Sequence, residues 1–425
     1  MNLQVDYINE HILKTFGQMI KIRRHLAKLT LRELASHSGL SHTLLNKIEH
    51  GLVPITEESY EKITRALRVN FMHDEEKNQR FFELRKQVKD ALFYVAIPNI
   101  LPKMEQIEIE EPYYLNSCLT IDYIVLFIGV YNYPHHGKME KTKMFLQAID
   151  YVSDMLDSNL YEDYALYRGI YYFNLKEYEV ALDNLHKGLD NNPSETSVPL
   201  YNYFLGRTYG ESYKLTKSTK YFKIAMQLFE RQNNMRRAVY ARLYIAVNRM
   251  KMADFDQLID ELNFIEQYAI REKLTGLTYV TRINTLIYHI LRHDYLQAIE
   301  TASKIQNKTG LYYYYLAYAQ IKENLISEAL KTIQIGENEV SKSDYQTKID
   351  TIGFDFLEGI IDPENTENYE TILEEYFYES IKSCAYNRTQ IAFKYYREML
   401  VEKRLYKKAY DITKLMIDMN KKVMK

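Results

Sequence analysis

Residues 30–51 read TLRELASHSGLSHTLLNKIEHG, and this stretch predicts two short helices joined by a sharp turn. Thr30 and Glu33 have the spacing of a capping box, in which the Thr hydroxyl accepts the amide of the third helical residue and the Glu carboxylate returns to the cap amide. We therefore expect a helix to begin at Leu31. Gly39 suits the left-handed residue that ends a helix, so the chain turns there.

The second helix of this stretch is the candidate recognition helix. Ser41 is a good N-cap for it, and Leu45 and Ile48 lie three residues apart, so both can pack on a core. The opposite face carries side chains that can reach base edges or phosphates when a helix lies in a major groove. The predicted DNA contacts on this helix are Ser41, His42, Thr43, Asn46 and Lys47. Glu49 is expected to support the fold from inside.

The surrounding segment, residues 17–70, carries nine Lys and Arg against five Glu and no Asp, whereas the whole chain has a net charge of −2. A positive excess on a small unit is typical of a surface that meets phosphates. Arg23, Arg24 and Arg32 are the predicted phosphate contacts, which hold register without reading sequence. The segment is expected to form five short helices. The alternative is a helical bundle that docks a protein, because buried Leu and Ile at helical spacing would look the same.

The composition places the 425-residue chain among ordered helical proteins. It has only 14 Gly and 8 Pro, with 26% charged and 46% hydrophobic residues. Cys118 and Cys384 lie far apart and form no metal-ligand spacing, which favours a reducing compartment, the cytoplasm, and no bound metal. The most apolar run, residues 119–130, is too short to span a bilayer. No catalytic motif is present, so we expect neither an enzyme nor a cofactor.

Three segments are predicted. Residues 1–70 form the helix-turn-helix domain, and residues 71–104 form a linker helix and a connector that contains proline. Residues 105–425 are expected to be a sensor and dimerisation domain built of successive helices separated by short polar turns.

A fixed period within residues 105–425 predicts tetratricopeptide-like helical pairs. In the segment from Glu162, residues of the tetratricopeptide type occupy offsets 8, 11, 17, 20 and 32: Gly169, Tyr172, Tyr178, Ala181 and Pro193. The next segment begins at Pro199 and keeps the spacing with Leu205, Gly206, Tyr209, Phe222 and Ala225. Small residues at offsets 8 and 20 let two helices approach, and each pair must stack on the next to cover its apolar face. Weaker copies follow, so five or more repeats are expected.

Stacked pairs of this kind form a right-handed superhelix whose first helices line a concave groove. The inward offsets hold candidate peptide ligands, because Arg grips carboxylates, Asn pairs with peptide backbone, and Tyr supplies apolar area with a polar tip. These residues are Tyr203, Arg207, Arg242, Asn284, Tyr314 and Tyr318. The alternative for any one of the 40 tyrosines is simple packing between helices.

Residues 17–70 resemble the Cro/repressor-type helix-turn-helix family, with matching residues at Leu34-Ala35, Gly39-Leu40-Ser41, Leu45, Ile48-Glu49 and Gly51. Leu31 departs from the family, which usually has a DNA-binding Gln at that place, and Leu44 is apolar where a small polar residue is common. The order of a helix-turn-helix before tetratricopeptide repeats is similar to the peptide-pheromone regulators of Gram-positive bacteria, the group containing Rap, Rgg, NprR, PlcR and PrgX.

This resemblance implies an all-α homodimer that binds an operator in double-stranded DNA and a short signalling peptide, with DNA binding altered by the peptide. The Tyr, Lys, Asn and Ile content is similar to that of low-GC Firmicutes, and a clostridial regulator of sporulation and toxin synthesis is a candidate relative. Two alternatives stay open. The array could bind and inhibit a response-regulator protein, as in Rap-like members, or the chain could be a mobile-element repressor without a peptide ligand.

Overall fold

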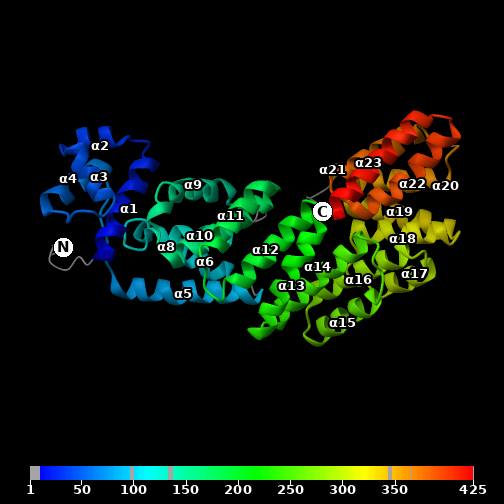
Figure 1. Cartoon of the computed structure of the whole chain (residues 1–425), viewed down its shortest axis with the longest axis horizontal. Helices are drawn as coiled ribbons and strands as arrows, with labels where there is room; N and C mark the ends of the chain where they lie inside the picture. Colours follow the sequence, from blue (N-terminus) through cyan, green and yellow to red (C-terminus); the bar gives the residue numbers. More distant parts are fainter. Residues whose placement is uncertain (1–9, 96–99, 133–136, 343–346, 365, 425) are drawn as a thin grey trace. The chain divides into compact units, whose positions relative to one another are not determined.

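The computed structural model describes residues 10–95, 100–132, 137–342, 347–364 and 366–424, and within these ranges it is a succession of helices without a named strand. The chain divides into two compact units. The first contains residues 1–208 and 224–238, and the second contains residues 209–223 and 239–425. The predicted all-α class with repeated helical pairs is confirmed (Figure 1). No helix of the described ranges is long and apolar enough to cross a membrane.

The first unit begins with four helices around one small core (Figure 1). They are α1 Glu10–Leu26, α2 Leu31–Ser38, α3 His42–Glu49 and α4 Glu57–Leu67. The prediction of five helices between residues 17 and 70 was therefore wrong. The residues between α3 and α4 form a turn, in which Gly51 has a positive φ of 64°, instead of a fifth helix.

The start and end signals that the sequence carries are confirmed in α2 and α3. The Thr30 hydroxyl accepts the Glu33 amide, the Glu33 carboxylate accepts the Thr30 amide at 2.7 Å, and α2 begins at Leu31. These hydrogen bonds lower the pKa of Glu33. Gly39 ends α2 with φ 68°, and the Ser41 hydroxyl accepts the Leu44 amide to start α3.

The first unit continues with a long helix and a bundle that leads into the repeats. These elements are α5 Glu75–Tyr94, α6 Leu101–Ile109, α7 Glu111–Tyr114, α8 Thr120–Tyr131, α9 Met139–Asp150 and the short 3-10 helix Ser153–Met155. The apolar run of the sequence forms α8, which is buried along nearly its whole length. It packs against α9 and α10, in the interior of this part of the unit.

The repeats follow as helical pairs. Those of the first unit and its boundary are α10 Ser158–Asn174 with α11 Tyr178–Asp190, and α12 Val198–Glu211 with α13 Leu215–Arg231. The glycines at the contacts explain the close approach. A Cβ on Gly169 would lie 2.6 Å from the Leu185 side chain, and one on Gly188 would lie 2.3 Å from the Tyr201 hydroxyl. Neither position has space for a larger side chain.

The pairs of the second unit repeat the pattern around two apolar cores. They are α14 Met235–Lys251 with α15 Leu258–Arg271, α16 Thr275–Leu291 with α17 Tyr295–Ser303, α18 Gly310–Lys322 with α19 Ile326–Ser341, α20 Lys348–Ile361 with α21 Tyr369–Lys382, and α22 Tyr386–Glu402 with α23 Tyr406–Met424. The first turn of α14 belongs to the first unit, and the remainder belongs to the second.

The turns inside many of these pairs share an uncommon backbone feature, a left-handed residue that is not glycine. Lys176, Tyr213, Ala253, His293 and Asn324 have φ between 55° and 64°. Each position follows the C-terminal end of the first helix of a pair, where a left-handed residue closes the turn. A Cβ in this conformation is strained, so the fold adopts these turns against local preference.

Candidate DNA-binding surface and peptide groove

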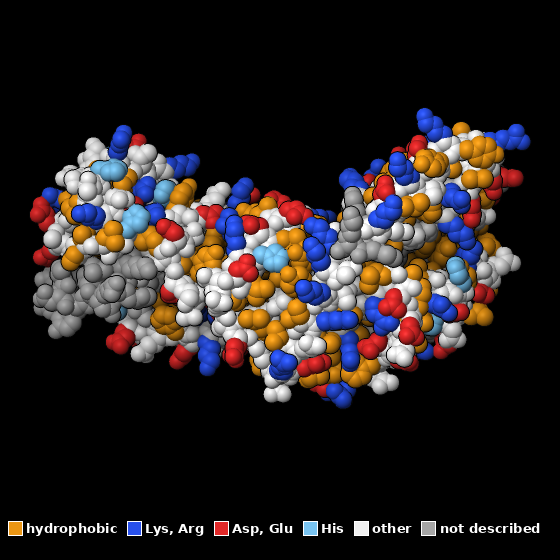
Figure 2. Space-filling model, in the orientation of Figure 1, with side chains coloured by type: hydrophobic (Ala, Val, Ile, Leu, Met, Phe, Trp, Pro, Cys, Tyr) orange, Lys and Arg blue, Asp and Glu red, His pale blue; other side chains and the backbone are white. Residues whose placement is uncertain are grey.

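The helix α3 presents one polar face to solvent and buries the other. Leu45 and Ile48 are buried in the core of the four-helix unit, as the sequence predicted. The candidate base contacts His42, Thr43, Asn46 and Lys47 are all exposed, and Ser41 is exposed at the N-cap. Lys, Arg and His side chains are visible on the surface formed by α2 to α4 (Figure 2). The face that would enter a groove is therefore accessible.

The three arginines predicted to contact phosphates lie in different environments. Arg32 is exposed in the first turn of α2, next to the recognition helix. Arg24 is buried, and its Nε and Nη2 donate to the two carboxylate oxygens of Glu49 at 2.7 and 2.9 Å. This bidentate pair gives Arg24 a structural role and explains why an acidic residue is tolerated in the recognition helix.

Arg23 joins the four-helix unit to the bundle behind it. Its Nη2 donates to the Leu115 carbonyl at 2.8 Å and to Asn116 Oδ1 at 2.9 Å. Burial lowers the pKa of this guanidinium, although Glu111 nearby opposes the shift. These bonds draw Arg23 away from a DNA surface, so Arg32 is the arginine of the three whose position fits a phosphate contact.

Further contacts fasten α1 and the segment before α5 to the bundle. Gln18 Nε2 donates to the Met155 carbonyl at 2.9 Å in a buried position. The His25 ring stacks on Tyr151 with 3.5 Å between ring centroids and an interplanar angle of 3°. The Met72 amide donates to the Asn116 carbonyl at 2.6 Å. The recognition helix is thus exposed on a body that packs firmly against the helical bundle.

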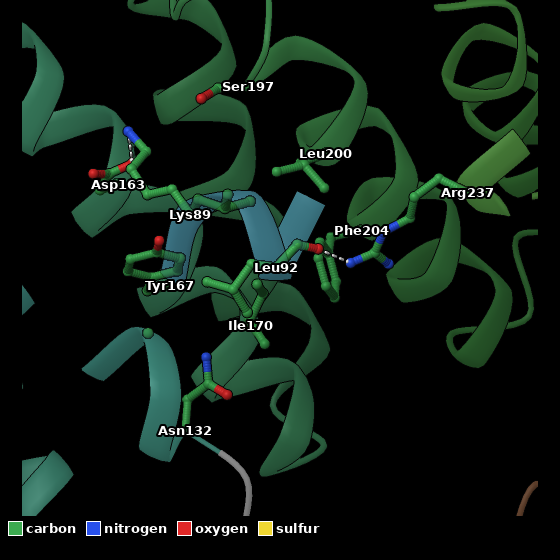
Figure 3. A pocket seen from close by; sticks show the side chains of 12 residues that line it. Lys89, Leu92, Asn132, Asp163, Tyr167, Ile170, Ser197, Leu200, Phe204 and Arg237 are labelled. Carbon is green, nitrogen blue, oxygen red and sulfur yellow. Dashed lines mark hydrogen bonds and ion pairs between the residues drawn. The ribbon is translucent and has the colours of Figure 1, made fainter. Parts of the chain in front are cut away.

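The side chains at the predicted inward offsets of the first two repeats do face a common side. The helix α5 covers that side. Asp163, Leu166, Tyr167 and Ile170 of α10, with Leu200 and Phe204 of α12, line a cavity together with Lys89 and Leu92 of α5 (Figure 3). The cavity measures about 40 Å³, enough for only a few water molecules. The long helix α5 therefore occupies the inner face of these repeats.

Ion pairs hold α5 in this place. Arg85 donates to Asp122 at 2.8 Å and to Asp163 at 3.1 Å. Lys89 Nζ lies 2.9 Å from the carboxylate of Asp163. The sequence contains a signal for this packing, because the linker has two cations four residues apart and an inward offset of the first repeat has a carboxylate. The pattern of the linker alone predicts only a connecting helix.

The two candidate peptide contacts in the first unit are engaged with their neighbours. Tyr203 is buried, with the Arg237 guanidinium 5.1 Å from its ring centre. Arg207 is half-buried, with its guanidinium 4.5 Å from the ring centre of Phe173. Both contribute to packing between repeats, and their role in peptide binding stays a prediction.

The four candidates in the second unit separate into two kinds. Tyr314 and Tyr318 are 1% and 5% exposed, and Arg388 lies 4.6 Å from the Tyr314 ring centre, so these tyrosines are core residues. Arg242 and Asn284 are half-buried. Arg242 Nε lies 3.1 Å from Glu261 and Asn284 Nδ2 donates to the Val280 carbonyl at 2.8 Å, contacts that a ligand could exchange.

Comparison with known proteins gives a family match in the N-terminal region and similar solved structures for most of the chain. Residues 20–72 match the helix-turn-helix family model. No curated protein sequence matches the chain. The apo quorum sensor NprR from B. thuringiensis has a similar structure, with 15% identity and a TM-score of 0.59 over 81% of this chain and 99% of NprR.

Two peptide complexes are also similar in structure. A Rap protein complexed with Competence and Sporulation Factor has 14% identity and a TM-score of 0.64 over 81% of this chain and 98% of its own. NprR in complex with its cognate peptide NprX has 16% identity and a TM-score of 0.58 over 78% and 98%. At these identities the likeness establishes a common fold.

Proposed function

We propose that this protein is a sequence-specific DNA-binding transcription regulator controlled by a short signalling peptide. Residues 20–72 match a helix-turn-helix model, and the fold is similar to those of NprR and Rap. The peptide would bind in the helical array. The proposal includes no catalytic step and no cofactor, and it assigns the chain to the cytoplasm, in keeping with two cysteines that form no disulfide.

The observation that carries the DNA-binding part is the division of α3 into a buried and an exposed face. Leu45 and Ile48 are buried, whereas His42, Asn46 and Lys47 are exposed. A docking bundle would gain most from an exposed apolar face, but this face is polar and cationic. Such a face suits base edges and phosphates.

The test is DNA retention by the full-length protein. Genome-wide occupancy identifies bound fragments, and gel-shift titration compares the wild type with a variant carrying His42→Ala, Thr43→Ala, Asn46→Ala and Lys47→Ala. We expect retention to be lost while helicity is kept, because each base contact contributes about 1–3 kcal/mol. The double variant Asp183→Ala, Lys187→Ala removes an exposed ion pair outside the domain and serves as the control. Equal binding by the quadruple variant would contradict the proposal.

The peptide-binding part is supported by the shared fold with two peptide complexes and by the positions of Arg242 and Asn284. Short peptides encoded beside the gene are the probes, and calorimetry measures their affinity. Replacing Arg242 and Asn284 together by Ala should lower the affinity at least tenfold, because a carboxylate grip and a backbone contact are both removed. Unchanged affinity would remove these residues from the site.

A homodimer is also part of the proposal, and α23 supports it. One side of this helix packs inward through Ala409, Ile412 and Met416, but Tyr406 and Tyr410 on the other side are 62% and 65% exposed. Large apolar or aromatic side chains gathered on one exposed helix face are typical of a surface that contacts another protein.

A second copy of the chain is the occupant that the charges of α23 favour. In an antiparallel pair of α23 helices, Lys407 lies opposite the partner's Asp418, and Lys414 lies opposite the partner's Asp411. All four of these side chains are exposed. Sedimentation of the variant Tyr406→Glu, Tyr410→Glu should give a monomer where the wild type gives a dimer.

The response-regulator alternative is separable from DNA binding. If the array acted by binding a response regulator, the quadruple α3 variant would keep full activity in a pull-down with response-regulator proteins, and the wild type would retain no specific DNA fragment. The exposed polar face of α3 favours the DNA-binding function over this alternative.

A further inference from the structure

The C-terminal end of α5 is bound by side chains from a distant part of the chain. The last turn of α5 contains no basic residue of its own, and the carbonyls at the end of a helix lack partners within it. Arg237 supplies the missing donors. Its Nε donates to the Phe93 carbonyl at 3.2 Å, and its Nη2 donates to the Leu92 carbonyl (Figure 3).

Asn234 completes this contact from the start of α14. Its Nδ2 donates to the Phe93 carbonyl at 2.8 Å, while its Oδ1 accepts the amide of Arg237 at 3.1 Å. One side chain therefore caps α14 and binds the end of α5. Asn234 and Arg237 are 1% and 6% exposed, so both contacts are shielded from water. We call these two residues the α5 clamp.

The physical chemistry makes the clamp strong and specific. A guanidinium at a helix C-terminus meets the negative end of the helix dipole, and hydrogen bonds from a charged donor are stronger than neutral ones. Aromatic packing surrounds it, because Phe93 lies 5.7 Å from Phe229 between ring centres and Arg237 lies 5.1 Å from the Tyr203 ring centre. Because its guanidinium is hydrogen-bonded to α5 and packed on an aromatic ring, a displacement of Arg237 would break these contacts or move the end of α5.

The other end of α5 leads directly into the helix-turn-helix domain. Asp74 caps α5 by accepting the Lys77 amide at 3.1 Å, and two residues earlier Met72 is hydrogen-bonded to Asn116. Between the ends, Arg85 and Lys89 are paired with carboxylates of α8 and α10. A helix of 20 residues spans about 30 Å, so α5 extends from the helix-turn-helix domain to the clamp.

The clamp residues begin the helix that continues into the second unit, since α14 starts at Met235 and belongs to that unit from Val239 onward. We propose that Asn234 and Arg237 couple the repeat array to the DNA-binding domain, by holding the C-terminal end of α5 and thereby setting the affinity of the helix-turn-helix for DNA. This inference rests on the proposed DNA-binding function. It assigns the two residues a positioning role, because neither lies at the DNA surface or among the candidate peptide contacts.

The test uses the full-length protein and two measurements. Hydrogen exchange reports the opening of residues 86–94 of α5, and gel-shift titration reports affinity for a DNA fragment that the wild type retains. Arg237→Met keeps the bulk of the side chain but removes its donors. We expect exchange in α5 to rise about tenfold or more, from the loss of a charged hydrogen bond, and DNA affinity to change at least fivefold.

Two further variants separate coupling from misfolding. Asn234→Asp keeps the oxygen that caps α14, since Asp is as good an N-cap as Asn, but loses the donor to Phe93. It should reproduce the effects of Arg237→Met. Arg236→Met changes the neighbouring residue, which makes no hydrogen bond to α5, and should leave both measurements at wild-type values.

The outcomes distinguish the coupling from the proposed function. Unchanged α5 exchange in Arg237→Met and Asn234→Asp would overturn the clamp. Faster α5 exchange with DNA affinity within twofold of the wild type would overturn the coupling and leave the DNA-binding function in place. Failure of the wild type to retain any DNA fragment would overturn the proposed function, and the coupling with it.

Discussion

Arg24 and Glu49 form a bidentate ion pair inside the helix-turn-helix domain, with Arg24 Nε 2.7 Å from Glu49 Oε1 and both side chains less than a tenth exposed. The pair joins the last turn of α1 to the last residue of α3, the recognition helix. Arg24 Nη1 also donates to the Leu29 carbonyl at 3.0 Å, so the same guanidinium orders the turn before α2. One ion pair therefore fixes three elements around the DNA-binding surface.

Replacing Glu49 by Gln should destabilise the domain by about 3–5 kcal/mol, because it leaves the Arg24 charge buried without a counter-charge. Native-state hydrogen exchange of α1 to α4 amides measures this local free energy of opening. Glu58→Gln is the matched control, since Glu58 pairs with Lys62 on the exposed surface, and it should have no measurable effect. Equal changes in the free energy of opening for Glu49→Gln and Glu58→Gln would contradict a stabilising role of the buried pair.

Gly17 should not tolerate even an alanine. A Cβ there would lie 2.2 Å from the Ile48 carbonyl oxygen and 2.8 Å from the Glu49 carbonyl oxygen, both of them backbone atoms that cannot rotate away. Gly17→Ala is expected to cost about 1–3 kcal/mol through overpacking, read by hydrogen exchange in α1 and α3. Gly276→Ala in α16 meets nothing within 4 Å and should instead stabilise its helix by about 0.5–1 kcal/mol. A stable Gly17→Ala domain would contradict the packing of α1 on α3.

The contact between His25 and Tyr151 should weaken in acid. Burial, with Arg24 and Lys21 nearby, lowers the pKa of His25 from 6.5 to about 4. Between these values the unfolded chain binds the proton more readily than the folded one, so this contribution is complete above pH 6.5 and is lost as pH falls toward 4. His25→Phe keeps an aromatic ring and should remove that part of the pH dependence. A titration of the His25 ring by NMR with a midpoint near 6.5 would refute this.

The buried tyrosines of the second unit should not affect peptide recognition. Tyr314→Phe and Tyr318→Phe remove hydroxyls from side chains that are 1% and 5% exposed. Calorimetry with a peptide that binds the wild type should give affinities within twofold for both variants. A tenfold loss in either would place that hydroxyl at the ligand and restore it to the site.

The sequence determined the local structure of α2 and α3 because their signals are short-range. The cap at Thr30, the left-handed Gly39 and the cap at Ser41 each depend on contacts within four residues, and each was predicted at the residue where the structure has it. The burial of Glu49 was also predicted, but its partner Arg24 was assigned to phosphate. The ion pair spans 25 residues and depends on how α1 crosses α3, which periodicity does not encode.

The repeats were predictable for a related reason, since Gly169 and Ala181 mark contacts within one helical pair. The position of α5 was not. Its contacts with Asp163 and Arg237 join residues that are 78 to 145 positions apart in the sequence. The repeat pattern predicts which side of the array a residue faces, but it does not predict which other element covers that side. The inward offsets place Tyr203 and Arg207 among the candidate peptide contacts, and in the fold both also pack against side chains of neighbouring helices.

The left-handed residues at the turns, among them Lys176, Tyr213 and His293, make the array less stable than its helices and cores would allow. Glycine would adopt the same backbone without strain, and each replacement could gain up to about 1 kcal/mol after the extra freedom of the unfolded chain is subtracted. A variant with glycine at several turns would therefore melt at a higher temperature. The strain at these turns is therefore a cost in stability that substitutions can remove, in keeping with the general finding that natural proteins are not at their stability optimum.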